Sequence, residues 1–221
     1  MLGIPNHLIP DRLARELETH DFICGSDEAG YGAWAGPLVV CAVVVPRTWL
    51  LEGLTDSKKL SATVRERLYA TLVKTVPHYM VEVTPEEIDA EGVGKAWPKA
   101  HEKAIQGALD AHKGEQPLVI VDGNRSFSGA TALPKADLLI PAVSAASVLA
   151  KVHRDRIMRE MDLEYPGYAF KSHVGYGTQK HRAALERLGV TPIHRKSYSP
   201  ISSMVVNPEA PDIMELLDSL E

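Results

Sequence analysis

The stretch that decides the fold is Cys24-Gly-Ser-Asp27-Glu28-Ala-Gly30-Tyr31-Gly32-Ala-Trp-Ala-Gly36-Pro37. It follows the apolar run 21–24 and precedes the β-branched run 38–45, and both runs predict strands. Two adjacent carboxylates therefore stand at a strand end. Gly30 and Gly32 follow them, and glycine lets a backbone approach a ligand closely. This arrangement favours metal ions and a nucleic-acid or nucleotide ligand.

Two simpler interpretations of this stretch compete. An Asp-Glu pair at a strand end is often a solvated turn, and clusters of glycine and proline often mark only a loop. The spacing Gly30-x-Gly32-x-x-Ala35 also fits a dinucleotide-binding fingerprint, which requires a helix directly after the glycines. A strand ending at Pro46 is expected there instead, so we interpret the fingerprint as a coincidence.

The composition predicts a single domain with a real core, because the chain has 221 residues and is 45% hydrophobic. No stretch has the length of a membrane span, and the first residues lack the layout of a secretory signal. Cys24 and Cys41 lie in predicted strands and are expected to be reduced core residues, which suits a cytosolic protein. No cysteine–histidine spacing resembles a zinc site.

The charge of the chain is unevenly distributed. A net charge of −5 argues against a protein that coats nucleic acid indiscriminately. Ten Lys and Arg residues but only five Asp and Glu residues fall between Lys151 and Pro200. Such a locally positive segment is typical of a footprint for a polyanion, although chance clustering on solvated helices gives the same count.

The pattern of predicted elements indicates an α/β fold. Strands are expected at 21–27, 38–45, 78–84, 118–122 and, at the sheet edge, 137–140. Helices are expected at 10–18, 61–74, 85–88, 97–112, 142–165, 178–188 and 212–220. We predict a five-stranded mixed sheet flanked by helices, with the strand that ends in Asp27 at its centre. Residues 1–200 would form the catalytic domain with its C-terminal helices, and residues 201–221 a tail with a short acidic helix.

Four acids that are far apart in the chain could meet in this fold. Asp27 and Glu28 end one predicted strand and Asp122 ends another, and ligand sites in open α/β sheets lie where strands end. Asp155 is expected on the helix 142–165. Mg²⁺ and Mn²⁺ prefer hard oxygen ligands, and two such ions about 4 Å apart can promote phosphodiester hydrolysis. The acids therefore predict a two-metal site.

One difficulty concerns the adjacent acids. Neighbouring side chains of a regular strand point to opposite faces, so Asp27 and Glu28 reach one site only if the strand alternation breaks at once. Gly30 and Gly32 are expected to provide that break.

The fourth acid also has an alternative interpretation. Asp155 shares one helical stripe with Ser147 and Lys151, at intervals of four residues. An ion pair with a flanking arginine is the competing role, the candidates being Arg154, Arg156 and Arg159.

Five motifs resemble those of bacterial ribonuclease HII, and they occur in the right order from about Gly25 to Tyr198. They are Gly25-Ser-Asp27-Glu28-Ala-Gly30-x-Gly32-x-x-Ala-Gly36-Pro37, Asp56-Ser57-Lys58-Lys59-Leu60, Val121-Asp122-Gly123-Asn124, Ser144-Ala-Ala-Ser-Val-Leu-Ala-Lys151-Val-x-Arg-Asp155-Arg-x-Met158, and Gly175-Tyr176-Gly177-Thr178 with His181 and Pro192-Ile-His194-Arg195.

The resemblance implies an RNase H-like fold and an endonuclease that hydrolyses RNA in RNA–DNA hybrids and at ribonucleotides embedded in duplex DNA. The products would carry 5′-phosphate and 3′-hydroxyl ends. Two Mn²⁺ or Mg²⁺ ions would be held by Asp27, Glu28, Asp122 and Asp155. A cytoplasmic monomer that acts in DNA replication and repair is expected.

The resemblance also implies substrate contacts. The backbone of Gly30, Tyr31 and Gly32 would grip the ribose 2′-hydroxyl, and Tyr176 would stack on the deoxyribose that follows the cut. Further contacts, several of them with phosphates, are implied for Ser57, Lys58, Lys59, Asn124, Lys151 and Arg195. Arg195 and His181 could equally well have structural roles.

The sequence departs from the family pattern at Tyr31, where an arginine usually stands between the glycines. An arginine would hold a phosphate through charge-assisted hydrogen bonds, whereas tyrosine keeps only the backbone grip. Our hypothesis is that action on a single embedded ribonucleotide is weakened relative to longer RNA tracts. Two other functions compete: a resolvase- or transposase-like DNA nuclease of the same superfamily, and an inactive module that binds hybrids.

Overall fold

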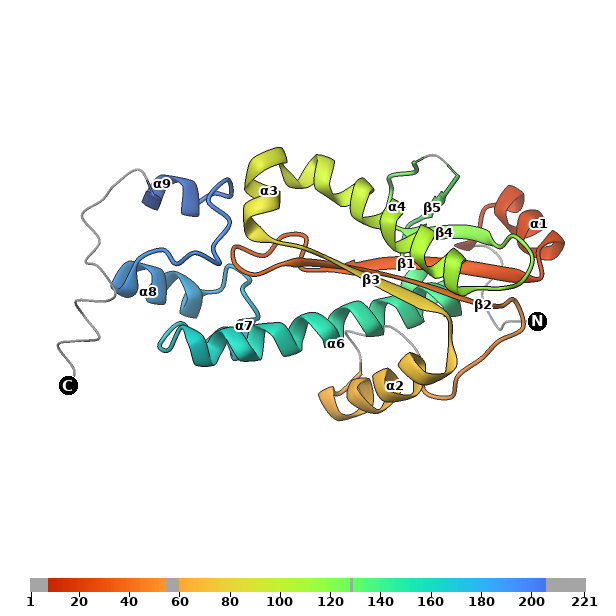
Figure 1. The fold of residues 1–221 in the computed structure, drawn as a ribbon, viewed down its shortest axis with the longest axis horizontal. Coiled ribbons are helices and arrows are strands. Elements are labelled where there is room, and N and C mark those ends of the chain that lie inside the picture. The colour runs from red at the N-terminus through yellow and green to blue at the C-terminus, as the bar shows by residue number, and fades with distance from the viewer. Residues whose placement is uncertain (1–7, 55–59, 128, 206–221) are drawn as a thin grey trace. The chain divides into compact units, whose positions relative to one another are not determined.

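The computed structural model describes residues 8–54, 60–127 and 129–205 of the chain. Its helices and strands, labelled in Figure 1, are α1 (Asp11–Thr19), β1 (Phe22–Ala29), β2 (Leu38–Pro46), α2 (Ala62–Thr75), β3 (His78–Val83), α3 (Pro85–Glu91), α4 (Val93–Ala111), β4 (Leu118–Asp122), β5 (Thr131–Leu133), α5 (Ala136–Leu139), α6 (Pro141–Glu164), α7 (Phe170–His173), α8 (Gln179–Leu188) and α9 (Ile201–Val205).

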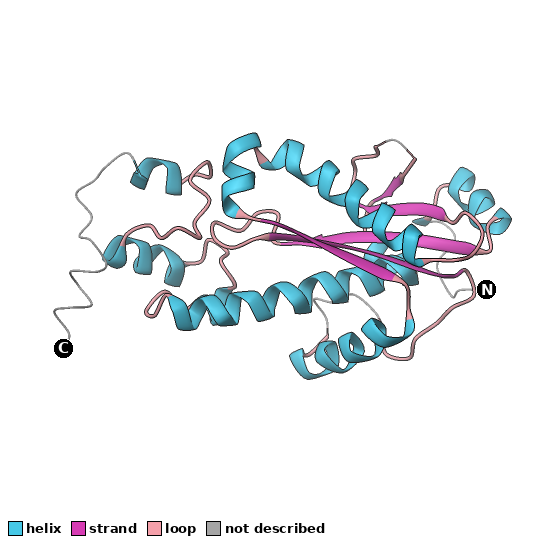
Figure 2. Cartoon of the chain, in the orientation of Figure 1, coloured by secondary structure: helices cyan, strands magenta, loops and turns pink. Residues whose placement is uncertain are grey.

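The sheet, whose strands are magenta in Figure 2, has five strands in the order β3-β2-β1-β4-β5. β1 pairs with β2 in antiparallel and with β4 in parallel orientation, and β4 and β5 are parallel. This confirms the predicted mixed sheet, with the strand that carries Asp27 at its centre. Because β1 and β4 are parallel, their carboxyl ends lie at the same end of the sheet.

The described chain divides into two compact units. The first comprises the residues up to Ala29 together with Val39–Glu82 and Pro98–Val152, and it holds nearly all of the sheet. The second comprises Gly30–Leu38, Val83–Trp97 and the residues from His153 on. Several elements, α4 and α6 among them, begin in one unit and end in the other.

Two features of the first unit explain how its central strands pack against the helices. β2 is buried from Leu38 to Val45, as expected for a strand that is covered on both faces. In β1, a side chain at Gly25 would collide with the backbone of Ala142 and Val143. Glycine therefore lets α6 pack directly against the sheet. Within this unit, α4 and α6 lie on opposite sides of the sheet (Figure 1).

The second unit has its own apolar core. Tyr168 and Phe170 stack with ring centroids 5.1 Å apart, and they are buried together with Met158, Leu185 and Ile201. Helix α8 begins just after Thr178, the first residue of the predicted helix, and the Thr178 side chain caps it by accepting from the His181 N–H.

The prediction of a strand at 137–140 is wrong. Those residues lie in helix α5, and the fifth, edge strand is Thr131–Leu133 instead. A short apolar run does not distinguish a strand from a helix by its periodicity. Here the Ile140 N–H bonds to the Ala136 carbonyl and closes a helical turn.

Other differences from the prediction are smaller. Helix α4 begins at Val93, four residues before the expected start at Trp97, and the short helices α7 and α9 were not expected. The predicted helix at 212–220 lies outside the described residues. A strand rather than a helix follows Gly32, which confirms that the dinucleotide fingerprint is coincidental.

Two compositional predictions can be compared with the structure. Cys24 and Cys41 are both free and buried, as expected. In the ranges that the structure covers, every helix is too short or too polar to cross a membrane.

Candidate active site

Asp27 is a buried carboxylate near the end of β1, with 6% of its surface exposed. It accepts hydrogen bonds from the Glu28 N–H, at 2.7 Å, and from the Ser147 side chain on α6. Burial raises the pKa of Asp27 well above its usual value, and the nearby carboxylates of Glu28 and Asp122 raise it further. Two of the other predicted acids, Glu28 and Asp122, are therefore close enough to Asp27 to repel its carboxylate.

The position of Asp122 follows from strand register. Ser26 of β1 lies beside Val121 of β4 in the parallel ladder, so Asp27 and Asp122 are the next residues on their strands. The Asp122 Oδ1 atom accepts a hydrogen bond of 2.7 Å from the Ala136 N–H at the start of α5. The helix that replaces the predicted edge strand thus orients this acid.

Glu28 projects from the other face of β1. Its Oε2 atom lies 3.2 Å from Nε2 of His101 on α4, whereas Asp27 contacts α6. The strand remains paired through Ala29, which lies opposite Val39. The expectation that the glycines break the alternation at once is therefore wrong, because pairing with β2 keeps the backbone regular past both acids. The Glu28 carboxylate nevertheless lies close enough to Asp27 to contribute to its raised pKa, so a break in the alternation is not needed to bring the two acids near each other.

The donor chemistry of these three acids fits a divalent cation. They offer hard oxygen ligands, and a cation would relieve the mutual repulsion that raises the pKa of Asp27. Within the described ranges, no three or more His, Cys, Asp or Glu side chains are already grouped so that they could hold a metal ion. Glu28 is instead engaged by His101.

Asp155 lies in the second unit, half-buried on α6, two helical turns after Ser147. Its carboxylate attracts the Arg154 guanidinium electrostatically, and its backbone carbonyl accepts from Arg159 Nε at 3.1 Å. Lys151 is also half-buried, one turn before Asp155. The functional roles of Asp155 and Lys151 remain predictions.

Gly30 and Tyr176, two predicted substrate-binding residues of the second unit, contact each other. The Gly30 N–H donates to the Tyr176 hydroxyl at 3.2 Å. Gly30 has a φ of +93°, and a side chain there would collide with the Arg154 guanidinium, so only glycine fits. Tyr176 is 39% exposed and its ring centroid lies 5.4 Å from Cζ of Arg154. Gly32, in contrast, is exposed, with open space where a side chain would stand.

Arg154 was not predicted as a functional residue, yet it holds the segment that contains Gly30. Its buried guanidinium donates to the carbonyl oxygens of Ala35 at 3.0 Å, Pro37 at 2.8 Å and Val174 at 2.8 Å. Burial lowers the pKa of Arg154 to about 10, which leaves it charged at neutral pH.

Arg195 is also buried and bonded to the same segment. Its Nε donates to the Gly36 carbonyl at 3.0 Å, and its Nη1 donates to the Tyr31 carbonyl at 2.9 Å. The Tyr31 carbonyl accepts a second bond, of 2.8 Å, from the Tyr198 hydroxyl. These contacts favour the structural role for Arg195 that the sequence left open.

His181 belongs to a hydrogen-bonded chain that ends at Tyr176. The Thr191 N–H donates to His194 Nδ1 at 2.9 Å, the two histidine Nε2 atoms lie 3.0 Å apart, and His181 Nδ1 lies 3.1 Å from the Tyr176 carbonyl. Burial lowers the pKa of His181 to about 4 and that of His194 to about 3, so both rings are neutral at pH 7. This favours a structural role for His181 as well.

The remaining predicted contacts divide into two groups. Ser57, Lys58 and Lys59 lie outside the described residues, and Asn124 is exposed just after β4.

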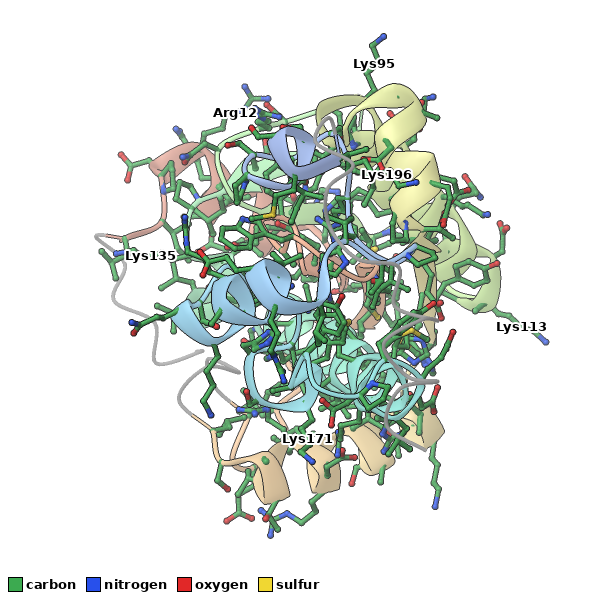
Figure 3. The ribbon with its side chains drawn as sticks, turned by 90° about the vertical axis from the view of Figure 1, so that its left-hand side faces the viewer. Arg12, Lys95, Lys113, Lys135, Lys171 and Lys196 are labelled. Carbon is green, nitrogen blue, oxygen red and sulfur yellow. The ribbon has the colours of Figure 1, made fainter. Side chains whose placement is uncertain are left out.

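The basic segment from Lys151 to Pro200 contains both surface and buried cations. Lys171 and Lys196 lie at the surface (Figure 3), whereas Arg154 and Arg195 are buried. Part of its positive charge therefore supports the fold rather than facing a polyanion.

A mixed five-stranded sheet with a buried carboxylate, Asp27, and a half-buried one, Asp122, at the ends of its central parallel strands defines a class of protein. It is the class of RNase H-like α/β proteins, in which ligand sites are expected where the strands end.

The comparisons with other proteins identify the family. A sequence profile described as Ribonuclease HII matches residues 24–200. A ribonuclease HII of Ralstonia nicotianae is 47% identical over 184 residues, which cover 81% of this chain and 77% of the relative. The chain belongs to the ribonuclease HII family. It is therefore an endoribonuclease that acts on RNA–DNA hybrids, which argues against both the DNA nuclease and the inactive binding module.

Solved structures share the fold. The ribonuclease H2 of Pyrococcus horikoshii is 26% identical with a TM-score of 0.67, and the match covers 83% of this chain and 96% of that one. A ribonuclease HIII described as Bst-RNase HIII in complex with Mn²⁺ has a TM-score of 0.69 at 20% identity, covering 90% of this chain and 73% of that one.

Proposed function

We propose that this endoribonuclease cleaves both RNA–DNA hybrids and ribonucleotides embedded in duplex DNA, with two divalent cations held by Asp27, Glu28, Asp122 and Asp155. The observation that carries the proposal is Asp27, whose pKa is raised first by burial and further by two neighbouring carboxylates. Such a group is costly for the fold unless a cation uses it. When bound, the cations would activate the attacking water and stabilise the leaving oxygen.

The residues of the site have distinct tasks in this proposal. Asp27 offers a carboxylate that is shielded from water, and the Ala136 N–H fixes the orientation of Asp122. Asp155 completes the set from the stripe of α6 that also carries Ser147. Mn²⁺ or Mg²⁺ suits these oxygen donors, and the ribonuclease HIII of similar fold is described with Mn²⁺.

Recognition of RNA would depend on the segment that follows β1. The backbone of Gly30, Tyr31 and Gly32 is proposed to contact the ribose 2′-hydroxyl, the group that distinguishes RNA from DNA. Gly30 and Tyr176 already share a hydrogen bond, so the exposed Tyr176 ring is placed beside this backbone. The phosphates would be contacted by polar and basic side chains, for which we propose Ser57, Lys58, Lys59, Asn124 and Lys151.

Two finer points belong to the same proposal. Tyr31 in place of arginine would weaken the preference for a single embedded ribonucleotide, because it adds no charge at the phosphate. We also expect a cytoplasmic monomer whose catalytic domain spans residues 1–200.

An end-labelled duplex with one ribonucleotide tests this function. We expect cleavage in Mg²⁺ or Mn²⁺ but not in EDTA, with 5′-phosphate and 3′-hydroxyl ends. Asp122→Asn should lower turnover by at least about 10³-fold and still bind hybrid, because it removes a carboxylate charge and keeps the shape. Cleavage of an all-DNA duplex at a similar rate, or full activity in EDTA, would contradict the proposal.

A further inference from the structure

A buried histidine that the sequence analysis did not single out contacts one of the proposed metal ligands. His101 lies on α4 and is completely buried. Its Nε2 atom is 3.2 Å from Oε2 of Glu28, whose side chain is 22% exposed. The contact is made on the face of β1 opposite to the one from which Asp27 reaches Ser147.

The other nitrogen of the ring is held by the same strand. Ser26 Oγ lies 2.8 Å from His101 Nδ1 and 3.0 Å from the Cys41 carbonyl of β2. The ring is thus fixed between two residues of β1, Ser26 and Glu28, which are two positions apart and point to the same face.

The hydrogen bonds of His101 with Ser26 determine which ring nitrogen carries the proton that faces Glu28. If the Ser26 hydroxyl donates to Nδ1, the proton of the neutral ring is on Nε2 and points to Glu28. If the hydroxyl donates to the Cys41 carbonyl, Nδ1 must donate to Ser26, and the Nε2 proton that an ionised carboxylate requires makes the ring a doubly protonated imidazolium. With Glu28 ionised, as a metal ligand must be, Nε2–H donates to it in both cases.

We infer that His101 is a positioning residue that orients the Glu28 carboxylate for the divalent cation, with Ser26 fixing the ring. The inference rests on the proposed role of Glu28 as a ligand. It explains how an acid on the second face of an unbroken strand is held in one orientation. Hydrogen-bond partners of metal ligands typically change metal affinity by about 10–100-fold when they are removed.

Two substitutions separate positioning from packing. The side-chain amide nitrogen of His101→Gln extends about as far as Nε2 and can still donate to Glu28. That of His101→Asn corresponds to Nδ1 and reaches only Ser26. Both replace an aromatic ring by a smaller amide, so both should lose stability to a similar degree, which thermal unfolding measures.

Calorimetric titration of the substrate-free protein with Mn²⁺ tests the inference. We expect His101→Asn to bind Mn²⁺ about 10-fold or more weakly than the wild type, and His101→Gln to stay within about threefold. At saturating Mn²⁺ the KM for hybrid should be unchanged in both, since His101 is buried and cannot contact the substrate itself. Equal affinities in the two variants, or a wild-type affinity in His101→Asn, would overturn it.

A control variant distinguishes this inference from the proposed function. Asp122→Asn removes a proposed ligand itself and should abolish most of the Mn²⁺ binding. If Asp122→Asn binds Mn²⁺ like the wild type, the metal site is wrongly assigned. If Asp122→Asn loses binding while His101→Asn does not, only the role of His101 is refuted.

Discussion

The molecule buries charge in two regions with opposite consequences. The carboxylate cluster, Asp27 with Glu28 and Asp122, places like charges together, and burial holds the pKa of Asp27 above its usual value. The arginine-held loop, residues 30–37, instead surrounds the guanidinium groups of Arg154 and Arg195 with backbone carbonyl oxygens.

The difference lies in the groups that surround each buried charge. Carboxylates of like charge that are held together oppose folding, whereas a buried guanidinium with good hydrogen bonds becomes destabilising only when a partner is removed. The cluster is thus a place where the fold gives up stability, as the proposed metal site would require. The loop is a place where charge holds a backbone in a fixed shape, including the positive φ of Gly30.

The largest effect is expected from a substitution that removes the central acid of the carboxylate cluster. Asp27→Asn should lower turnover by at least about 10³-fold, because it removes the central proposed ligand. The same change should raise the Tm at neutral pH in the absence of divalent ions, since the buried charge is gone. A gain of about 1 kcal/mol corresponds to about 2–4 °C for a chain of this size.

The pH dependence of that gain follows from the sign of the pKa shift. The folded pKa of Asp27 lies above the unfolded value, so the folded state binds more protons between the two and loses stability as the pH rises. The Tm difference between variant and wild type should therefore be absent at pH 3 and grow toward neutral pH. A lower Tm for Asp27→Asn at pH 7 would show that the cluster is not strained.

The next effect concerns the arginine-held loop. Arg154→Lys keeps the charge but cannot donate to the three carbonyl oxygens of Ala35, Pro37 and Val174 in the same geometry. We expect a loss of about 3–5 kcal/mol of unfolding free energy, or a Tm lower by roughly 10 °C. Urea unfolding gives the free energy, and calorimetry gives the Tm.

The matched control is an exposed arginine of the same unit. Arg182 lies over the Trp34 ring, with Cζ 5.7 Å from its centroid. Arg182→Lys should cost less than about 1 kcal/mol, because exposed cation–π contacts are weak. Equal losses for the two variants would show that the hydrogen bonds from Arg154 to the carbonyl oxygens add nothing to stability.

The carboxylate cluster could be predicted from sequence, because its members follow strands whose apolar runs are clear. Asp27 and Asp122 meet where parallel strands end, and this needs only strand order and direction. The surroundings of Glu28, on the other face of the strand, could not be predicted in this way. Its contact with His101 depends on where α4 crosses the sheet, which local sequence does not encode.

The arginine-held loop was harder to predict for the same reason. Arg154 stands next to Asp155, so by sequence it was weighed only as an ion-pair partner, yet its guanidinium bonds to carbonyls more than a hundred residues away. A long cationic side chain among small and apolar residues of α6 was the available signal. The helix α5 in place of a strand shows a similar limit, because four residues carry too little periodicity.

The smallest effect is expected at Tyr31, and it tests whether the backbone of the arginine-held loop is fixed independently of this side chain. The Tyr31 carbonyl accepts from Arg195 and from the Tyr198 hydroxyl, so the backbone position of Tyr31 does not depend on its side chain. Tyr31→Arg should therefore keep the fold and add one cationic group for a phosphate. We expect cleavage of a duplex with one ribonucleotide to rise by about tenfold relative to one with four, the equivalent of about 1.4 kcal/mol.

The ratio of kcat/KM for the two duplexes, measured for wild type and Tyr31→Arg, gives this result. Tyr31→Phe is the matched control, because it keeps the ring and adds no charge, and its ratio should equal that of the wild type. A ratio that is the same in all three proteins would show that the side chain at this position does not read the substrate. The specificity would then come from the backbone alone, which the two bonds to the Tyr31 carbonyl hold in place.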